Sequence, residues 1–244
     1  MTILTLIQGD CLKVMRKIPD NSIDLVLTDP PYNVIGKTQK WDDKGQVDKF
    51  MCFTKDWLNE CYRILKENTA CYVFFGQKYI KEFYKLKTKF DIKRMLIWHH
   101  PNLAKPTRSV YLWTYDPIFY LVKGTPKFDA NFSQQENVDV FRYPKPQSNF
   151  NKERRYHPTS KPLNLIKKLI SPTTNEKDMV LDPFLGSGTT MKACLELNRN
   201  CIGVEIEPKY IQIAKKRLNW NSSLGSVKFE FYMEEDFEWV KEND

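Results

Sequence analysis

The sequence predicts an α/β protein with a doubly wound, mostly parallel sheet. Short apolar runs that suit buried strands alternate along the chain with amphipathic segments that suit helices, and this alternation is typical of such sheets. Two polar loops follow buried strands, at residues 28–32 and 183–188, and α/β sheets bind ligands at the carboxyl ends of their strands. We expect one domain over residues 1–244, because a chain of this length can form a single large core.

The N-terminal half carries compact apolar runs bounded by polar turns, which suit buried parallel strands. Between them, apolar residues recur every three or four positions, which predicts helices with one buried face. A polar stretch at 33–48 contains two glycines and is expected to be a loop. The expected elements are strands at 4–8, 22–28, 70–75, 95–99 and 118–122 and helices at 12–18, 49–66 and 78–89.

The segment 124–160 interrupts this alternation. It is rich in Pro, Asn, Gln, Lys and Arg and poor in aliphatic residues, so we expect irregular structure there. Long irregular segments in compact domains are often functional. Alternation resumes afterwards, with helices expected at 162–170, 189–197 and 208–218 and strands at 179–182, 201–205 and 227–233.

The composition excludes several classes of protein. Hydrophobic residues make up 41% of the chain, no apolar run approaches a membrane span, and the N-terminus does not resemble a signal peptide. The six cysteines form no CxxC pair and have no His cluster beside them, so we expect no metal site and no disulfide framework. We therefore expect a cytoplasmic protein whose cysteines are mostly small buried side chains.

The net charge of +8 and the pI of about 9.0 favour a polyanionic partner. Positive charge is clustered at two places. Positions 78–94 hold seven Lys and Arg residues, which suit a solvated helix face as well as they suit phosphate contacts. The second cluster is Lys152, Arg154 and Arg155, for which we predict phosphate contacts.

A glycine loop follows the strand expected at 179–182. The sequence of 179–190 is MVLDPFLGSGTT, in which Gly186 and Gly188 allow close approach of a ligand to the backbone and a helix N-terminus. Glu205 ends the next strand, where an acidic side chain can bind both hydroxyls of a ribose. NAD would fit the same arrangement, but the GxGxxG fingerprint is incomplete because position 191 is Met191.

The second loop, Thr-Asp-Pro-Pro-Tyr at 28–32, has the chemistry of an amine-binding pocket. Pro30 and Pro31 stiffen the backbone and leave carbonyl acceptors, Asp29 adds a carboxylate acceptor, and Tyr32 adds an aromatic face. Such a pocket can accept both hydrogens of an NH2 group on a flat ring and direct the nitrogen lone pair at an electrophile. A proline-stiffened turn with a surface tyrosine is the simpler alternative.

These motifs together resemble the amino-methyltransferases of DNA, specifically the circularly permuted β group, in which DPPY precedes the glycine loop. The resemblance covers nearly the whole chain. It includes the N-terminal GDCLKVMRKIPDNSIDLVLTDPPYN, the W-x-x-P-N-like stretch at 98–102, HPTSKP at 157–162, DPFLGSGTT and GVEIEPKYI. It implies a Rossmann-like methyltransferase sheet that binds S-adenosyl-L-methionine (AdoMet) and transfers its methyl group to an exocyclic amino group of a base.

The resemblance also implies roles for individual residues. Asp29, Pro30, Pro31 and Tyr32 would be catalytic. Thr159 and Lys161 would approach the methionine carboxylate of AdoMet, although position 160 is Ser160 where the family commonly has Gln. The AdoMet pocket would further include Asp10, Cys11, Asp29, Asp182, Phe184, Gly186, Ser187, Gly188 and Glu205.

Asp10 and Cys11 would lie at the adenine ring of AdoMet. Asp236 is a second candidate for the adenine-binding carboxylate. Asp10 is preferred, because its 19-residue spacing from Asp29 matches the family.

The partner implied by the resemblance is double-stranded DNA. The segment 125–156 lies where the family keeps its target-recognition region, and a base must flip out of the duplex to reach the pocket. Because this segment is short, either the recognised site is small or a second subunit, as in a homodimer, contributes. A cognate restriction endonuclease is a further partner that the sequence leaves open.

Several functions stay open at this stage. Asp before Pro-Pro-Tyr favours adenine N6 as the methyl acceptor, and cytosine N4 is the close alternative. A methyltransferase acting on RNA or on protein glutamine is less favoured. A non-catalytic DNA-binding subunit would show a broken DPPY or glycine motif, and both motifs are intact.

Overall fold

A nine-stranded sheet forms the centre of the protein in the computed structural model, which describes residues 1–31, 47–101, 111–126, 128, 138–146, 160–220 and 226–239. The strands lie side by side in the order β6-β4-β5-β3-β2-β7-β8-β1-β9. In chain order they are β1 Thr2–Gln8, β2 Ile23–Thr28, β3 Leu65–Phe74, β4 Asp91–His99, β5 Tyr115–Lys123, β6 Val140–Arg142, β7 Met179–Asp182, β8 Asn200–Glu205 and β9 Val227–Met233.

The sheet is mostly parallel, as the sequence predicts. Of the described strands, β5 alone runs against the others, because it pairs antiparallel with both β3 and β4. The remaining described pairs are parallel. Chain crossovers leave the centre in opposite directions, from β2 to β3 on one side and from β7 to β8 on the other. The boundary between β2 and β7 is therefore the switch point at which such sheets bind ligands.

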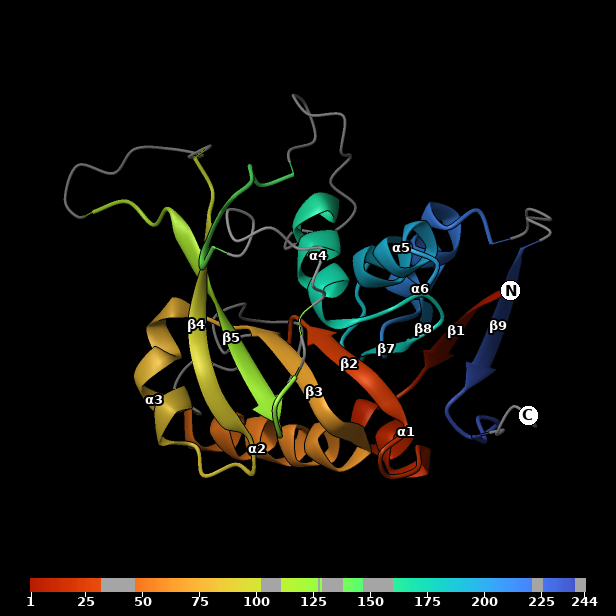
Figure 1. Ribbon diagram of the computed structural model, residues 1–244. Helices are drawn as coiled ribbons and strands as arrows, with labels where there is room; N and C mark the ends of the chain where they lie inside the picture. Colours follow the sequence, from red (N-terminus) through yellow and green to blue (C-terminus); the bar gives the residue numbers. More distant parts are fainter. Residues whose placement is uncertain are drawn as a thin grey trace.

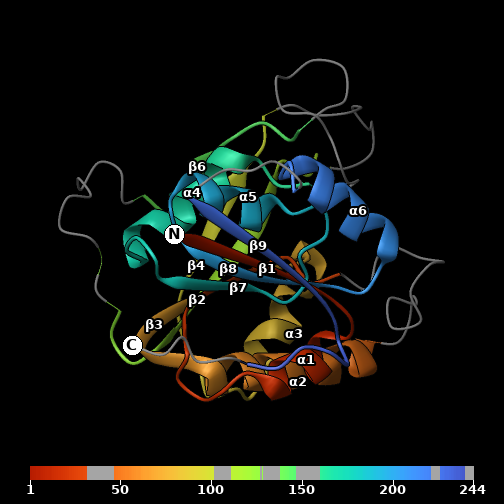
Figure 2. The same ribbon diagram turned by 90° about the vertical axis from the view of Figure 1, so that its right-hand side faces the viewer.

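Within the described residues, six helices cover the two faces of the sheet (Figures 1 and 2), so the sheet is doubly wound. The helices α1 to α3 lie on one face and α4 to α6 on the other. Their bounds are α1 Cys11–Lys17, α2 Val47–Ile64, α3 Ile80–Lys85, α4 Leu163–Ile170, α5 Thr189–Glu196 and α6 Pro208–Arg217, with 3-10 turns at Gln77–Tyr79 and Ser171–Thr173.

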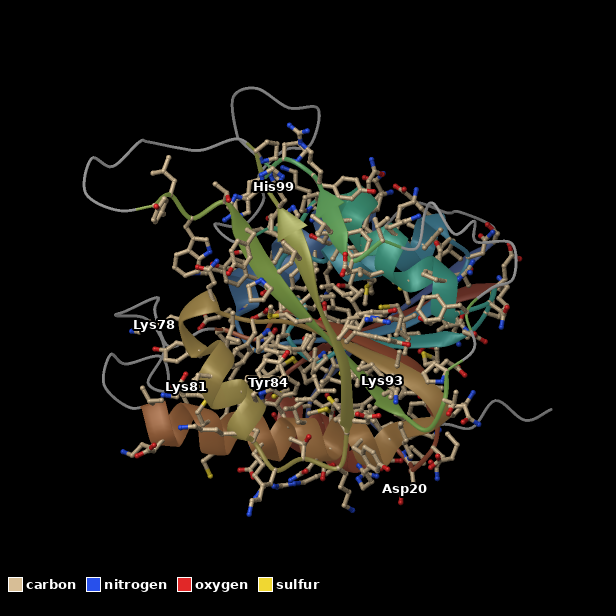
Figure 3. The ribbon with its side chains drawn as sticks, turned by 60° about the vertical axis from the view of Figure 1, so that its left-hand side comes forward. Asp20, Lys78, Lys81, Tyr84, Lys93 and His99 are labelled. Carbon is tan, nitrogen blue, oxygen red and sulfur yellow. The ribbon has the colours of Figure 1, made fainter. Side chains whose placement is uncertain are left out.

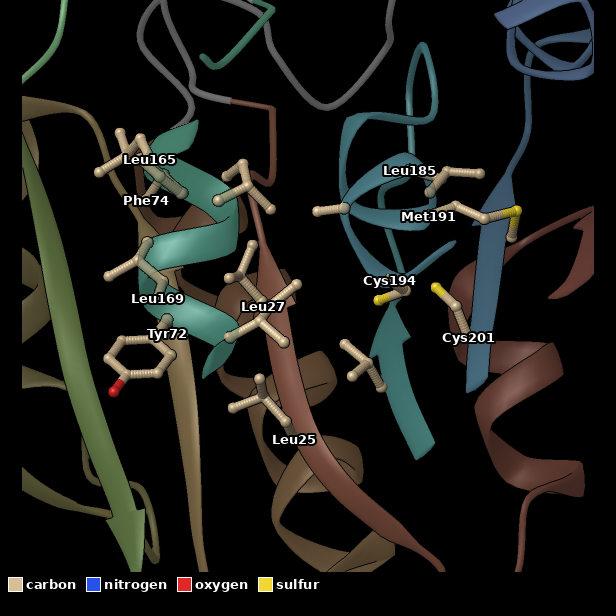
Figure 4. Packing of buried hydrophobic residues seen from close by; sticks show 14 of the residues in the cluster. Leu25, Leu27, Tyr72, Phe74, Leu165, Leu169, Leu185, Met191, Cys194 and Cys201 are labelled. Atoms are coloured by element: carbon tan, nitrogen blue, oxygen red, sulfur yellow. The ribbon is translucent and has the colours of Figure 1, made fainter. Parts of the chain in front are cut away.

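Alternating strand residues form two hydrophobic cores, one on each side of the sheet. Leu25 and Leu27 of β2 point toward α4 and pack with its Leu165 and Leu169 (Figure 4). Val26, between them, belongs to the opposite core with α1 and α2. This two-residue period is what the buried strand pattern predicts.

The structure differs from the sequence-based expectations in several element bounds: β3 begins at Leu65, inside the helix expected at 49–66, and β4 begins at Asp91, four residues before the expected strand. Two further differences concern the kind of element. The helix expected at 78–89 is shorter, since a 3-10 turn over Gln77–Tyr79 precedes α3 and the chain leaves the helix at Leu86. The segment 124–160, for which no strand is expected, contributes β6, which extends the sheet beside β4. Pairing with an existing strand edge stabilises these three residues, which have little strand pattern of their own.

Candidate active site

A cavity of about 470 Å³ lies at the carboxyl ends of the four neighbouring strands β2, β7, β8 and β1. Each strand ends in a residue or turn that lines it, because parallel strands bring their carboxyl ends to the same edge. The residues that the sequence assigns to the site and that line this cavity are Asp10, Cys11, Asp29, Pro30, Pro31, Lys161, Asp182, Phe184, Gly186, Ser187 and Glu205.

Other assigned residues lie elsewhere or outside the described part of the chain. Gly188 forms the N-cap of α5, next to the lining residue Thr189. Asp236 is exposed after β9 and is not among the lining residues. The residues outside the described ranges are Tyr32, Thr159, Lys152, Arg154 and Arg155.

Asp182 connects the two loops of the cavity through hydrogen bonds. It is buried, and its carboxylate accepts hydrogen bonds from the hydroxyls of Thr28 (2.9 Å) and Thr190 (2.6 Å) and from the backbone N–H of Phe184 (3.1 Å). Burial raises the pKa of Asp182 to about 6, and these hydrogen bonds act against that shift. Asp182 thus links the end of β2, the glycine loop and the start of α5.

The glycine loop has the backbone conformation that its sequence predicts. Gly186 and Gly188 have φ angles of 54° and 80°, which side chains disfavour. A Cβ at Gly188 would also lie 3.0 Å from the Cβ of Ala214 on α6, so this position needs glycine for space as well.

Glu205, the last residue of β8, is hydrogen-bonded to this loop. Its two carboxylate oxygens accept backbone hydrogen bonds from Gly186 and Glu207, both at 2.8 Å. Burial raises the pKa of Glu205, and the hydrogen bonds act against this shift. Each carboxylate oxygen can accept more than one hydrogen bond, so the group can still receive two neighbouring hydroxyls at the cavity wall.

Asp29 forms an ion pair with Lys161 inside the cavity. The Lys161 side chain is only 8% exposed and that of Asp29 20%, and the ammonium also lies over the rings of Phe74 (4.9 Å) and Trp98 (5.9 Å). The sequence-based hypothesis directs Lys161 at a cofactor carboxylate, whereas in the structure its ammonium contacts the carboxylate of the DPPY motif.

Asp10 and Cys11 form the wall after β1. Asp10 caps α1, because its Oδ1 accepts hydrogen bonds from the backbone N–H groups of Leu12 (2.9 Å) and Lys13 (3.1 Å). Cys11 is buried, and burial raises the pKa of its thiol well above the ordinary value. Cys11 is therefore a neutral thiol that contributes shape and an apolar surface.

Beside Phe184, aromatic side chains that were not predicted from the sequence complete one wall of the cavity. The ring of Phe184 packs edge-on against Phe53 (6.0 Å) and Trp57 (5.5 Å) of α2. Phe53 lines the cavity together with Phe74, Ser160 and Tyr210. Helical periodicity does place Phe53 on the inner face of its helix, but it carries no signal for which loop that face meets.

The seven basic residues of 78–94 are all exposed but do not form one patch. Figure 3 shows Lys78 and Lys81 near α3 and Lys93 on the opposite side of β4. The chain turns back at 86–90, so the later members lie at the edge of the sheet away from the cavity. Lys78 lies in the 3-10 turn that follows the carboxyl end of β3.

Within the described ranges, no group of three or more His, Cys, Asp or Glu side chains is arranged to hold a metal ion. None of the helices there has the length and apolarity needed to cross a membrane.

The fold and the cavity define an α/β protein with a nucleoside-type pocket and a carboxylate suited to an amine at the switch point of its sheet. The family model described as DNA methylase, for N6/N4 methyltransferases, matches residues 23–216. The chain belongs to this family, which uses AdoMet as its methyl donor.

Individual relatives agree with the family assignment. The Type II methyltransferase M.HpaI of Haemophilus parainfluenzae is 35% identical over 232 residues, covering 88% of this chain and 74% of its own. The DNA adenine methyltransferase YhdJ of Escherichia coli is 30% identical over 243 residues, covering 88% and 82%. The crystal structure of the M1.HpyAVI–SAM complex matches with a TM-score of 0.69 at 27% identity, covering 88% of this chain and 99% of that one.

Proposed function

We propose that this protein methylates N6 of adenine in double-stranded DNA, at a specific sequence, with AdoMet as the donor. The observation that supports this most directly is the position of Asp29. Its carboxylate lies in the same cavity as the glycine loop and Glu205, so an amine acceptor and a nucleoside-type donor can meet there.

The residues present fit the cofactor. The cavity volume is in the range of small-ligand sites. Glu205 would bind the ribose hydroxyls, Asp10 and Cys11 would border the adenine ring, and Phe184 would pack on the cofactor. AdoMet could approach the loop backbone closely at Gly186, Ser187 and Gly188. Asp182 would keep that loop in position through the hydrogen bond that it accepts from the Phe184 N–H. When bound, AdoMet supplies an electrophilic methyl group on its sulfonium.

Asp29 has the central chemical role in this proposal. Its carboxylate would accept a hydrogen bond from the target amino group, and the Pro30 carbonyl would accept the second. These contacts increase electron density at the nitrogen and hold its lone pair in line with the methyl group. The carboxylate would also accept the proton that the amine loses.

Lys161 contributes positive charge beside that carboxylate. Its contact with Asp29 supports a role in orienting the catalytic group. The role that the family resemblance implies, binding of the methionine carboxylate together with Thr159, is a separate proposal for the same ammonium. The two roles affect different measurements: orientation of Asp29 affects kcat, whereas binding of the methionine carboxylate affects the affinity for the cofactor.

DNA would reach the cavity as a flipped-out base stacked on Tyr32. We propose that segment 125–156 recognises the target sequence and that Lys152, Arg154 and Arg155 contact phosphates. A homodimer would supply additional recognition surface for so short a segment. Because M.HpaI is a Type II methyltransferase, a cognate restriction endonuclease is included in the proposal.

The choice of adenine rests on Asp29 at the first motif position and on the relative YhdJ, which is named an adenine methyltransferase. Methylation of cytosine N4 is the alternative, since the same acceptors suit that amine. The test is to incubate the protein with DNA and methyl-labelled AdoMet, digest the DNA to nucleosides and separate them by mass. N6-methyladenine is expected; N4-methylcytosine would favour the alternative, and absence of label would favour a non-catalytic subunit.

A further inference from the structure

Glu234, the first residue after β9, contacts the turn that follows β1. Its backbone N–H donates to the Gln8 carbonyl (3.0 Å), and its Oε2 accepts a hydrogen bond from the backbone N–H of Asp10 (2.7 Å). Its Oε1 forms an ion pair with the Lys13 ammonium (2.8 Å). Both oxygens of this carboxylate are therefore engaged by the segment that begins at the cavity wall.

The approach of Glu234 to this turn is unusually close. A Cβ added at Gly9 would lie 2.4 Å from the Cβ of Glu234 and 2.7 Å from its Oε2, so the contact depends on Gly9 having no side chain. The Lys17 ammonium donates to the carbonyls of Glu234 (2.5 Å) and Glu235 (3.3 Å).

Packing interactions also fix the residues around Glu234. Phe237 is buried and packs against the ring of Tyr232 at 5.8 Å. The segment 232–237 is thus anchored to the start of α1 at several points, and it cannot shift without disturbing that turn.

Gly9, Asp10 and Cys11 all line the cavity, whereas Glu234 is not among the lining residues but contacts Gly9 and Asp10. By accepting the hydrogen bond from the Asp10 backbone N–H, the Glu234 carboxylate can fix the position of this part of the cavity wall. The hydrogen bond from Lys13 lowers the pKa of Glu234, which agrees with an ionised acceptor at neutral pH. The Lys13 side chain is mostly exposed, so we assign the larger effect to the backbone hydrogen bond and the Gly9 contact.

We propose that Glu234 is a positioning residue for the cofactor pocket, which acts by fixing the Asp10 turn at the adenine end of AdoMet. This inference rests on the role proposed above for Asp10. It assigns a function to the acidic sequence after β9, where Asp236 is the sequence-based candidate, and it places the functional carboxylate two residues earlier.

The first test compares binding of two probes, S-adenosylhomocysteine and 5′-methylthioadenosine, to the full-length protein. The second probe lacks the amino-acid end but keeps the adenine. Glu234→Ala should weaken both by a similar factor, about fivefold to tenfold, the size expected for one lost hydrogen bond. Glu234→Gln keeps an acceptor for the Asp10 N–H and should restore binding to within about twofold. Glu235→Ala, a matched change at an exposed neighbour, should leave binding unchanged.

The second test separates positioning from general stability. Asp10→Ser keeps a good helix cap but shortens the side chain. If Glu234 acts through Asp10, adding Glu234→Ala to Asp10→Ser should weaken binding no further, whereas independent effects would add. Additive losses, or equal losses in the Gln and Ala variants, would overturn the proposal. Thermal melting of each variant shows whether the fold is retained.

The outcome for Glu234 is distinguishable from the outcome for the proposed function. At saturating AdoMet, Glu234→Ala should methylate DNA with nearly the wild-type kcat and a raised KM for the cofactor. Wild-type protein that transfers no methyl group would contradict the function and leave the binding tests valid. Unchanged probe binding by Asp10→Ser would remove the role of Asp10, and the inference about Glu234 with it.

Discussion

The ammonium of Lys161 contacts the carboxylate of Asp29 within the cavity, although 132 residues separate them in the sequence. The ion pair is largely shielded from water and is bordered by the rings of Phe74 and Trp98. Removing one member of such a pair leaves an uncompensated charge, so the pair is expected to affect function more strongly than surface ion pairs do.

Lys161→Met should therefore lower kcat more than it weakens cofactor binding. Loss of a charged hydrogen bond predicts a decrease in kcat of about 10-fold to 100-fold. Lys161→Arg keeps the charge and is the matched control. Binding of S-adenosylhomocysteine and 5′-methylthioadenosine identifies the partner of the ammonium: selective weakening of the first, with kcat preserved, would mean that Lys161 binds the methionine carboxylate instead.

Asp29→Ala should abolish most methyl transfer and leave AdoMet binding largely intact, because Asp29 is assigned to the target amine more than to the cofactor. A decrease in kcat of about 10²-fold to 10⁴-fold is expected for loss of a group that handles the reacting proton. Asp29→Asn retains one acceptor oxygen and should lie between the alanine variant and wild type. Calorimetry and a transfer assay on the same preparation test this; wild-type turnover by Asp29→Ala would remove its catalytic role.

Glu205→Ala should weaken binding of S-adenosylhomocysteine by about 1–3 kcal/mol, since it loses charged hydrogen bonds to the ribose and loosens Gly186. Isothermal calorimetry measures the change. Glu196→Ala, on the exposed side of α5, is a matched control with no expected effect. An unchanged dissociation constant for Glu205→Ala would show that another acid binds the ribose.

The raised pKa of Asp182 predicts a pH-dependent stability. The folded-state pKa of about 6 lies above the ordinary value of 3.8, so the folded protein binds this proton more tightly than the unfolded chain does. The stabilising contribution is full below pH 3.8 and is lost as the pH rises through 6, with a total on the order of 3 kcal/mol.

Asp182→Asn removes this titration but keeps an acceptor for Thr28. Urea unfolding at several pH values should show the wild type losing stability relative to the variant between about pH 4 and pH 7. Parallel pH profiles for the two proteins would contradict the shift.

Charge reversal of Lys152, Arg154 and Arg155 should weaken DNA binding and reduce its salt dependence, by about one unit of slope for each lost phosphate contact. Reversal of Lys85, Lys87 and Lys89 changes the net charge equally at exposed positions away from the cavity edge. Fluorescence anisotropy at several salt concentrations compares the two. Equal effects would indicate that only the net charge matters.

The sequence alone is sufficient to predict the fold class and most of the cavity. Buried strands and amphipathic helices leave local periodic patterns, because burial of one face depends on the positions of near neighbours in the chain. Asp29, Asp182 and Glu205 could be assigned to one site because each lies at the carboxyl end of a strand, and parallel strands bring their carboxyl ends together. The family motifs then added the chemistry.

The tertiary structure decided which distant side chains meet. No local pattern encodes the strand order, so the pairing of Lys161 with Asp29 and the reversed direction of β5 were not predictable. β9 pairs with β1 in a parallel register that matches Met233 to Gln8, and the next residues, Glu234 and Gly9, therefore meet at the cavity edge. The sequence offered Asp236, in the acidic run after the last strand, as the alternative to Asp10, whereas the register of β9 with β1 brings Glu234 to the Asp10 turn.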